Sequence, residues 1–185
     1  MTKILGISGS LRRASYNTAL LRAATKLMPP QTTLEVGSIR GIPLYDGDVE
    51  AQGIPATVAQ LKEAIVAADG VLLVTPEYNN SVPGVFKNAI DWLSRPPADV
   101  KRVFAGKPFA LIGASPGGFG TTLSQVAWLP VLRTLGTHAW FGGRLLVARA
   151  GGVFDEAGAL KDAAIEEQLK QFLAGYVSFV QRAAR

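Results

Sequence analysis

A group of polar side chains near the amino terminus could bind a phosphate. They lie in the stretch SGSLRRASYN at residues 8–17 and are Ser10, Arg12, Ser15 and Asn17. Hydroxyl, guanidinium and amide groups all donate hydrogen bonds to phosphate oxygens. A helix is predicted to begin just after Ser15, and the first N–H groups of a helix also attract phosphate. We predict a phosphate loop in which Arg12 contacts the ligand and Arg13 faces solvent. Under the alternative interpretation, Ser15 only caps the helix and the arginines are solvated, although Ser15 can do both.

This loop matches neither of the two common phosphate motifs. The chain contains no Gly-Lys-Ser/Thr, which a Walker loop requires. The dinucleotide pattern Gly-x-Gly-x-x-Gly is also absent, because residues 6–11 read GISGSL and place serine and leucine at the second and third glycine positions. The sequence therefore favours a mononucleotide, and it carries no motif that reports on the 2′-phosphate of a dinucleotide.

Two further loops carry residues suited to a flat ring. The segment PEYNNSVPG at 76–84 offers Pro76, Glu77, Tyr78 and Asn79, and the segment SPGGFG at 115–120 offers Ser115, Gly117 and Gly118. An aromatic side chain among polar groups can lie beside a heterocycle, and glycine lets the backbone approach it closely. A proline- and asparagine-rich turn with a surface tyrosine is the other interpretation of the second loop.

The hydrophobic pattern predicts the elements that position these loops. Strands are expected at 3–8, 33–39, 70–75, 107–114 and 138–148, and helices at 16–28, 55–69, 85–95, 121–135 and 159–182. Residues 40–54 are expected to form a loop, and Pro130 to kink or interrupt its helix. Five alternating strands and helices predict a three-layer α/β flavodoxin-like fold, with a parallel sheet of order 2-1-3-4-5 flanked by helices.

In this sheet order, the strands that precede the three loops are neighbours. The carboxyl ends of parallel strands lie on one edge of the sheet, so all three loops should meet there. Each loop alone could be ordinary turn chemistry. Their convergence on one edge predicts a single ligand site.

Composition excludes several classes of protein. The chain has no cysteine and one histidine, so a zinc site is not expected. Its net charge is +5, but the basic residues are scattered and no nucleic-acid partner is expected. No apolar run reaches the length of a membrane span, and we expect a single cytoplasmic domain over residues 1–185. Residues 1–34 contain five basic and no acidic side chains, which predicts a local positive field.

Residues 113–117 read GASPG and match the Gly-x-Ser-x-Gly nucleophile elbow of hydrolases. Pro116 has no N–H for the oxyanion hole, and no acid lies between Ser115 and the only histidine, His138. His138 should also lie at the opposite end of the sheet from Ser115. We therefore set the hydrolase interpretation aside.

Three segments together resemble the NAD(P)H-dependent FMN reductase family, which includes bacterial quinone, azo-dye and chromate reductases. They are GSLRRASYN at 9–17, PEYNNSVPGVFKNAIDW at 76–92 and SPGGFG at 115–120, and VFDEAGAL at 153–160 extends the similarity. The resemblance implies non-covalent FMN, with the phosphate held by Ser10, Arg12, Ser15 and Asn17. The ribityl chain and ring would be bordered by Pro76, Glu77, Tyr78, Asn79, Ser115, Gly117 and Gly118. Two departures from the family pattern, Phe86 and Thr121, could alter the substrate pocket.

The resemblance also implies an activity and an assembly. NADPH or NADH would pass hydride to flavin N5, and the flavin would then reduce a small-molecule acceptor such as a quinone, free flavin or azo compound. No side chain is expected to act as acid or base, because the flavin carries the chemistry. A homodimer or homotetramer is implied, with the helix after PGVFKN in the interface. The alternatives are a flavodoxin-like electron carrier, which the charge of +5 disfavours, and a flavin-binding module without turnover.

Overall fold

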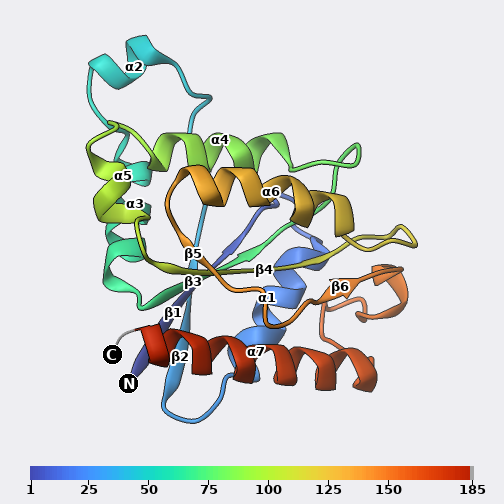
Figure 1. Cartoon of the computed structure of the whole chain (residues 1–185). Coiled ribbons are helices and arrows are strands. Elements are labelled where there is room, and N and C mark those ends of the chain that lie inside the picture. Colours follow the sequence, from blue (N-terminus) through green and yellow to red (C-terminus); the bar gives the residue numbers. More distant parts are fainter. Residues whose placement is uncertain (184–185) are drawn as a thin grey trace.

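The computed structural model describes residues 1–183 and shows a parallel sheet between two layers of helices (Figure 1). The sheet order is β2-β1-β3-β4-β5, which confirms the predicted flavodoxin-like order, and β6 also pairs with β4. The strands are β1 (Thr2–Ser8), β2 (Thr32–Gly37), β3 (Gly70–Val74), β4 (Pro108–Ala114), β5 (His138–Ala139) and β6 (Leu146–Val147).

The helices divide between the two faces of the sheet. Helices α1 (Tyr16–Lys26) and α7 (Ala163–Ala183) cover one face, and α3 (Ala56–Ala67), α4 (Gly84–Leu93) and α6 (Thr122–Thr134) cover the other (Figure 1). The short elements are α2 (Gly47–Ala51), α5 (Asp99–Val103) and the 3₁₀ turn η1 (Ala150–Gly152).

Strand β3 shows why the sheet needs helices on both faces. All five of its residues are buried, and successive side chains point to opposite faces. Leu72 and Val74 join the core beneath α1 and α7, whereas Val71 and Leu73 join the core beneath α3, α4 and α6. An uninterrupted apolar strand of this kind is typical of the centre of a parallel sheet.

Two short helices were not predicted. The predicted loop at 40–54 contains α2, whose first turn is capped by the Asp46 carboxylate accepting from the N–H of Asp48 at 2.9 Å. Helix α5 was not predicted. Of the two outcomes expected at Pro130, a kink or an interruption, the interruption does not occur, because α6 continues through this residue. Pro130 lies on the exposed face, where water can hydrogen-bond the carbonyl that its missing N–H leaves unpaired.

The predicted strand at 138–148 is two short strands. β5 pairs with the first residues of β4, and β6 pairs with the last. Between them the chain bends around Trp140, whose ring would lie 2.6 Å from a Cβ added at Gly142 and packs edge-on against Phe172 of α7. The middle of the expected strand is therefore a bend in which the Trp140 ring is packed.

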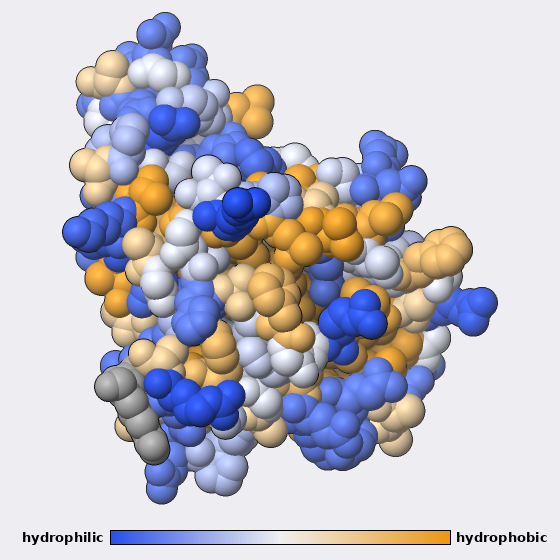
Figure 2. Space-filling model, in the orientation of Figure 1, coloured by the Kyte–Doolittle hydropathy of each residue, from blue (hydrophilic) through white to orange (hydrophobic). Residues whose placement is uncertain are grey.

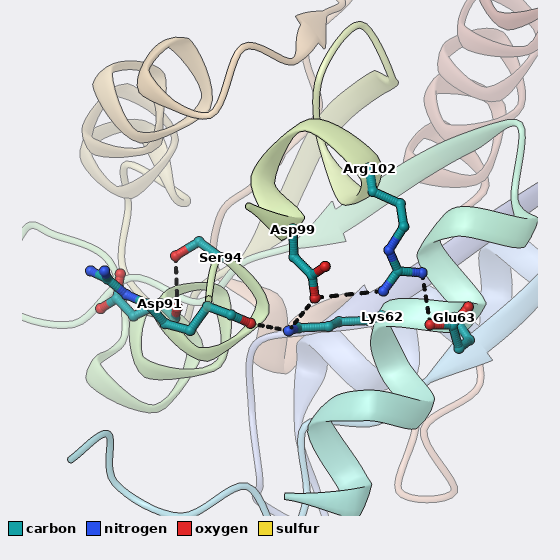
Figure 3. A network of polar contacts seen from close by, with 7 residues as sticks. Lys62, Glu63, Asp91, Ser94, Asp99 and Arg102 are labelled. Carbon is teal, nitrogen blue, oxygen red and sulfur yellow. Dashed lines mark hydrogen bonds and ion pairs between the residues drawn. The ribbon is translucent and has the colours of Figure 1, made fainter. Parts of the chain in front are cut away.

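A polar network joins α3 to α5 on the α3/α4/α6 face (Figure 3). Lys62 of α3, with only 2% of its side chain exposed, donates hydrogen bonds to the carbonyl of Arg95 and, at 2.9 Å, to the carboxylate of Asp99. Outside this pair, Arg102 contacts Glu63 at 2.8 Å, and both side chains are exposed. Because a buried ammonium needs a counter-charge, Asp99 is the partner on which Lys62 depends.

We predict that Asp99→Asn lowers the free energy of unfolding at pH 7 by about 1.5–3 kcal/mol, as expected for a hydrogen bond to a charged group. The hydrogen bond from Lys62 holds the pKa of Asp99 below its ordinary value of 3.8. The charged carboxylate therefore stabilises the fold above the unfolded-chain pKa, and this contribution is lost as the pH falls through the lower pKa of the folded state. Urea unfolding at pH 7 and in steps below pH 4 should show the difference between wild type and variant shrinking.

Glu63→Gln is the control for this prediction, because it removes the exposed partner of the same network. Its effect should be much smaller at every pH, since exposed ion pairs contribute little. A difference between wild type and Asp99→Asn that does not change with pH would contradict the assigned role of the carboxylate.

Candidate functional site

The carboxyl ends of β1, β3 and β4 meet at a small cavity of about 40 Å³. The three loops predicted from the sequence all reach it. Eight of the eleven predicted site residues line it: Ser10, Arg12, Ser15, Asn17, Pro76, Glu77, Tyr78 and Ser115. Tyr16, Ala114 and Pro116 also line the cavity and were not predicted, although each is next to a predicted residue. The cavity has room for one small polar group.

The first loop presents hydroxyl groups at the beginning of α1. Ser15 is the N-cap, and its oxygen accepts the N–H of Thr18 at 3.3 Å. Ser10 accepts the N–H of Arg12 at 3.3 Å. In both residues the oxygen serves as acceptor, so the hydroxyl hydrogen remains able to donate to a ligand. The N–H groups of Tyr16 and Asn17 precede the first intrahelical bond, which Ala19 makes to the Ser15 carbonyl at 2.9 Å.

Asn17 also connects the first loop to a strand that is distant in sequence. Its side-chain amide donates to the carbonyl of Ala114 at 2.8 Å and accepts the N–H of Ala114 at 2.9 Å. Asn17 is buried, so this pair of bonds fixes the beginning of α1 against the end of β4. One of its two N–H groups is left for a ligand.

The two neighbouring arginines differ in their surroundings. Both are exposed, but only Arg12 lines the cavity that contains Ser10 and Ser15. Arg13 is exposed and does not line this cavity. Arg12 is therefore the cation placed to neutralise a group in this cavity.

The second loop is a tight hairpin. Tyr78 and Ser81 exchange main-chain hydrogen bonds of 3.1 and 3.0 Å, and both intervening residues, Asn79 and Asn80, have φ near +50 to +60°. This is a two-residue turn of the type in which asparagine is favoured. Asn79 forms the turn and does not line the cavity, whereas the ring of Tyr78 is 47% exposed beside it.

Glu77 fixes the second loop to α6. One oxygen of its carboxylate accepts the N–H groups of Leu123 and Ser124 at 2.8 and 2.9 Å. The N-cap of this helix, Thr121, makes no side-chain capping bond, so Glu77 caps the helix from another loop. Its second oxygen remains able to accept a hydrogen bond from a ligand.

The third loop exposes its main chain at Gly117 and Gly118. A Cβ added at Gly118 would meet no atom within 4 Å, and one at Gly117 would meet only the Ser115 hydroxyl at 3.5 Å. Neither glycine has a left-handed φ. By contrast, a Cβ at Gly113 would lie 2.2 Å from the carbonyl oxygen of Thr75. The fold therefore requires glycine at 113, whereas the space at 117 and 118 is open to a ligand.

The two departures from the family pattern are packing residues. Phe86 and Thr121 are fully buried, and neither lines the cavity. A Cβ at Gly9 would lie 2.1 Å from the ring of Phe86, which therefore supports the first loop from below. Neither residue reaches the surface of this cavity, and their effect on a substrate pocket stays a prediction.

A hydrolase site is excluded by the strand register. His138 pairs with Pro108 at the beginning of β4, whereas Ser115 follows the end of that strand. The ring of His138 packs against Phe179 instead. Within residues 1–183, no group of three His, Cys, Asp or Glu side chains could hold a metal ion, and no helix is long and apolar enough to cross a membrane.

Comparison with known proteins agrees with this geometry. The family described as NADPH-dependent FMN reductase matches residues 2–152. An NAD(P)H-dependent FMN reductase of Pseudomonas aeruginosa is 46% identical over 180 residues, covering 97% of this chain and 96% of the relative. A quinone reductase of Pseudomonas putida is 37% identical over 177 residues, covering 92% of this chain and 88% of the relative.

Among solved structures, the flavoenzyme NAD(P)H:(acceptor) oxidoreductase FerB of Paracoccus denitrificans has a TM-score of 0.88 and 32% identity, and the match covers 99% of each chain. The family match includes all three loops that form the cavity. The chain belongs to the NADPH-dependent FMN reductase family.

Proposed function

We propose that this protein is an NAD(P)H-dependent FMN reductase whose acceptor is a quinone, free flavin, azo compound or similar small molecule. The observation that carries the proposal is the convergence of three loops on one cavity, in a chain of this family. When bound, FMN would take reducing equivalents from the nicotinamide and pass them to the acceptor. The side chains described above bind and orient, and none is assigned as an acid or base.

The residues of the first loop fit a phosphate group. Ser10 and Ser15 each keep a hydroxyl hydrogen to donate, and Asn17 keeps one N–H. The beginning of α1 adds main-chain N–H groups and a positive dipole end, and Arg12 adds a full charge. We assign these four residues to the FMN phosphate.

The other two loops fit a flat ring and its ribityl chain. We assign Pro76, Glu77, Tyr78 and Asn79 to one border, and Ser115, Gly117 and Gly118 to the other. The support is the exposed ring of Tyr78 and the open space over the two glycines, where backbone groups can approach a ligand. Hydrogen bonds from this backbone would hold the polar edge of the ring.

We further propose that the protein assembles as a homodimer or homotetramer through α4 and α6. Val85 of α4 and Leu123, Val126 and Leu129 of α6 are exposed apolar side chains, and Phe86 and Trp128 connect the two helices through an edge-on ring contact. Figure 2 shows hydrophobic side chains gathered on the face that carries α6.

Because nicotinamide dinucleotides are held inside the cell, we propose a cytoplasmic location.

The proposed activity is tested by the absorbance spectrum of the purified protein before and after NADPH is added. We expect a flavin spectrum that NADPH bleaches and that a quinone restores, with steady-state oxidation of NADPH. Flavin that NADPH does not bleach would favour a binding module or an electron carrier. Colourless protein that reduces no quinone when FMN and NADPH are added would exclude the activity.

Arg12→Ala should weaken FMN binding by about 10- to 100-fold, the range for a lost hydrogen bond between charged groups. Arg13→Ala is the matched control, because Arg13 carries the same charge one residue away and lies outside the cavity. Its effect should be below about threefold, from the weaker field alone. FMN fluorescence titration measures both, and equal losses would undo the division of roles.

Gly118→Ala should weaken FMN binding while leaving the free energy of unfolding of the flavin-free protein within about 0.5 kcal/mol of wild type. The added methyl meets no protein atom, so only a ligand would be displaced by it. Gly113→Ala is the contrasting variant, because its methyl collides with the Thr75 carbonyl and should destabilise the fold itself. Undiminished FMN affinity in Gly118→Ala would place the ring elsewhere.

A further inference from the structure

A second cavity lies beside the proposed FMN phosphate site, between the loop after β1 and the loop after β2. Its volume is about 350 Å³. Ser10 and Arg12 line both cavities, so the two are contiguous. The charged side chains that line the second cavity are Arg12, Arg13, Arg22 and Arg40, and we call it the arginine groove.

The arginine groove holds four positive charges without a counter-charge. No aspartate or glutamate lines it, and no carboxylate in the described part of the chain forms an ion pair with any of its arginines. Like charges gathered in a concave surface repel one another and raise the local concentration of anions. Because Arg40 comes from a different loop, the fold itself brings this fourth charge to the others.

The two loops that border the groove contain the same local structure. In the first loop, the Ser10 hydroxyl accepts the N–H of Arg12, and in the second, the Ser38 hydroxyl accepts the N–H of Arg40 at 3.1 Å. Both are Ser-x-Arg segments at the carboxyl ends of adjacent parallel strands. Each serine oxygen is an acceptor in its own turn, which leaves the hydroxyl hydrogen to donate outward.

A hydrogen bond between the loops fixes the width of the groove. The guanidinium of Arg40 donates to the carbonyl of Leu11 at 2.8 Å and keeps its other N–H groups. The apolar part of the lining includes Leu11 and Val36, which are 38% and 58% exposed. Guanidinium and hydroxyl donors next to exposed apolar side chains suit a phosphate attached to an aromatic base.

We propose that the arginine groove is a second phosphate site, which binds the phosphate of an adenine nucleotide beside the FMN phosphate. This proposal rests on the proposed function, because that function supplies two sources of such a group. One is the 2′-phosphate of NADPH, which NADH lacks. The other is the AMP half of FAD, which extends the phosphate of FMN. In the first case, the groove would make the protein bind NADPH more tightly than NADH. In the second case, it would make the protein bind FAD more tightly than FMN.

The test uses the double variant Arg13→Gln/Arg22→Gln. Neither side chain lines the FMN phosphate cavity, and neither forms an ion pair with a carboxylate of residues 1–183, so FMN binding and folding should be retained. The control variant, Arg133→Gln/Lys161→Gln, removes two exposed positive charges that do not line the groove. Both variants therefore carry the same net charge.

Calorimetric titration of the FMN-loaded protein with 2′,5′-ADP and with 5′-AMP tests the first source. Displacement of bound FMN by FAD, followed by the fluorescence of released FMN, tests the second. We expect the groove variant to lose at least about tenfold in affinity for 2′,5′-ADP or for FAD, and the control variant to change less than about twofold. A loss of affinity for 2′,5′-ADP without a loss for 5′-AMP identifies the 2′-phosphate of NADPH as the source, and a loss of affinity for FAD identifies its AMP half.

Three results would overturn the proposal. These are no binding of either probe to the wild type, equal affinities in wild type and groove variant, and equal losses in the groove and control variants. The last of these would mean that only net charge matters. Failure of the proposed function is seen separately, as protein without a flavin spectrum, and in that case the 2′,5′-ADP titration of the flavin-free protein still reports on the groove.

Discussion

Two hydrogen bonds between the side-chain amide of Asn17 and the main chain of Ala114 determine how the site is assembled. They join residues that are 97 positions apart, and they are buried, so neither partner can exchange them for water. They fix the beginning of α1 against the end of β4. A third bond, from the N–H of Gly9 to the carbonyl of Val74 at 2.9 Å, fixes the same loop to β3. The first loop is therefore held to the ends of β3 and β4 before any ligand arrives.

Several residues of the candidate site contribute to the fold and also keep groups that could bind a ligand. Ser15 caps α1, Asn17 joins α1 to β4 and Glu77 caps α6, yet each keeps a donor or acceptor that the protein does not use. This explains why the sequence supports both a structural role and a ligand-binding role for such residues. Gly117 and Gly118 behave differently, because neither packing nor a left-handed φ requires glycine there. The open space that they leave is consistent with the proposed position of the ring.

The sequence predicted the parts of the molecule that depend on local pattern. The long strands and helices follow hydrophobic periodicity, and the convergence of three loops follows from the sheet order, so most of the cavity lining was identified. The bend at Trp140 was not predictable, because it depends on an aromatic contact with Phe172 of α7, which lies more than 30 residues later in the chain. The contact of Phe86 with the first loop was not predictable either, because only the packed structure shows its ring against Gly9. Interactions between distant segments decided each of these cases.

The first 34 residues contain no acidic side chain, and the fold shows where their basic side chains lie. Lys3 lies near the amino end of β1, away from the site, whereas Arg12 and Arg13 lie beyond its carboxyl end. Arg40, which comes from outside that segment, completes the positive surface because the ends of β1 and β2 are neighbours. The Ser-x-Arg turns fix the backbone from which Arg12 and Arg40 extend, so these charges stay at the same edge whether or not an anion is present. A surface that concentrates positive charge on fixed loops stabilises a bound anion without the cost of assembling the charges first, which is the physical basis of preorganised binding.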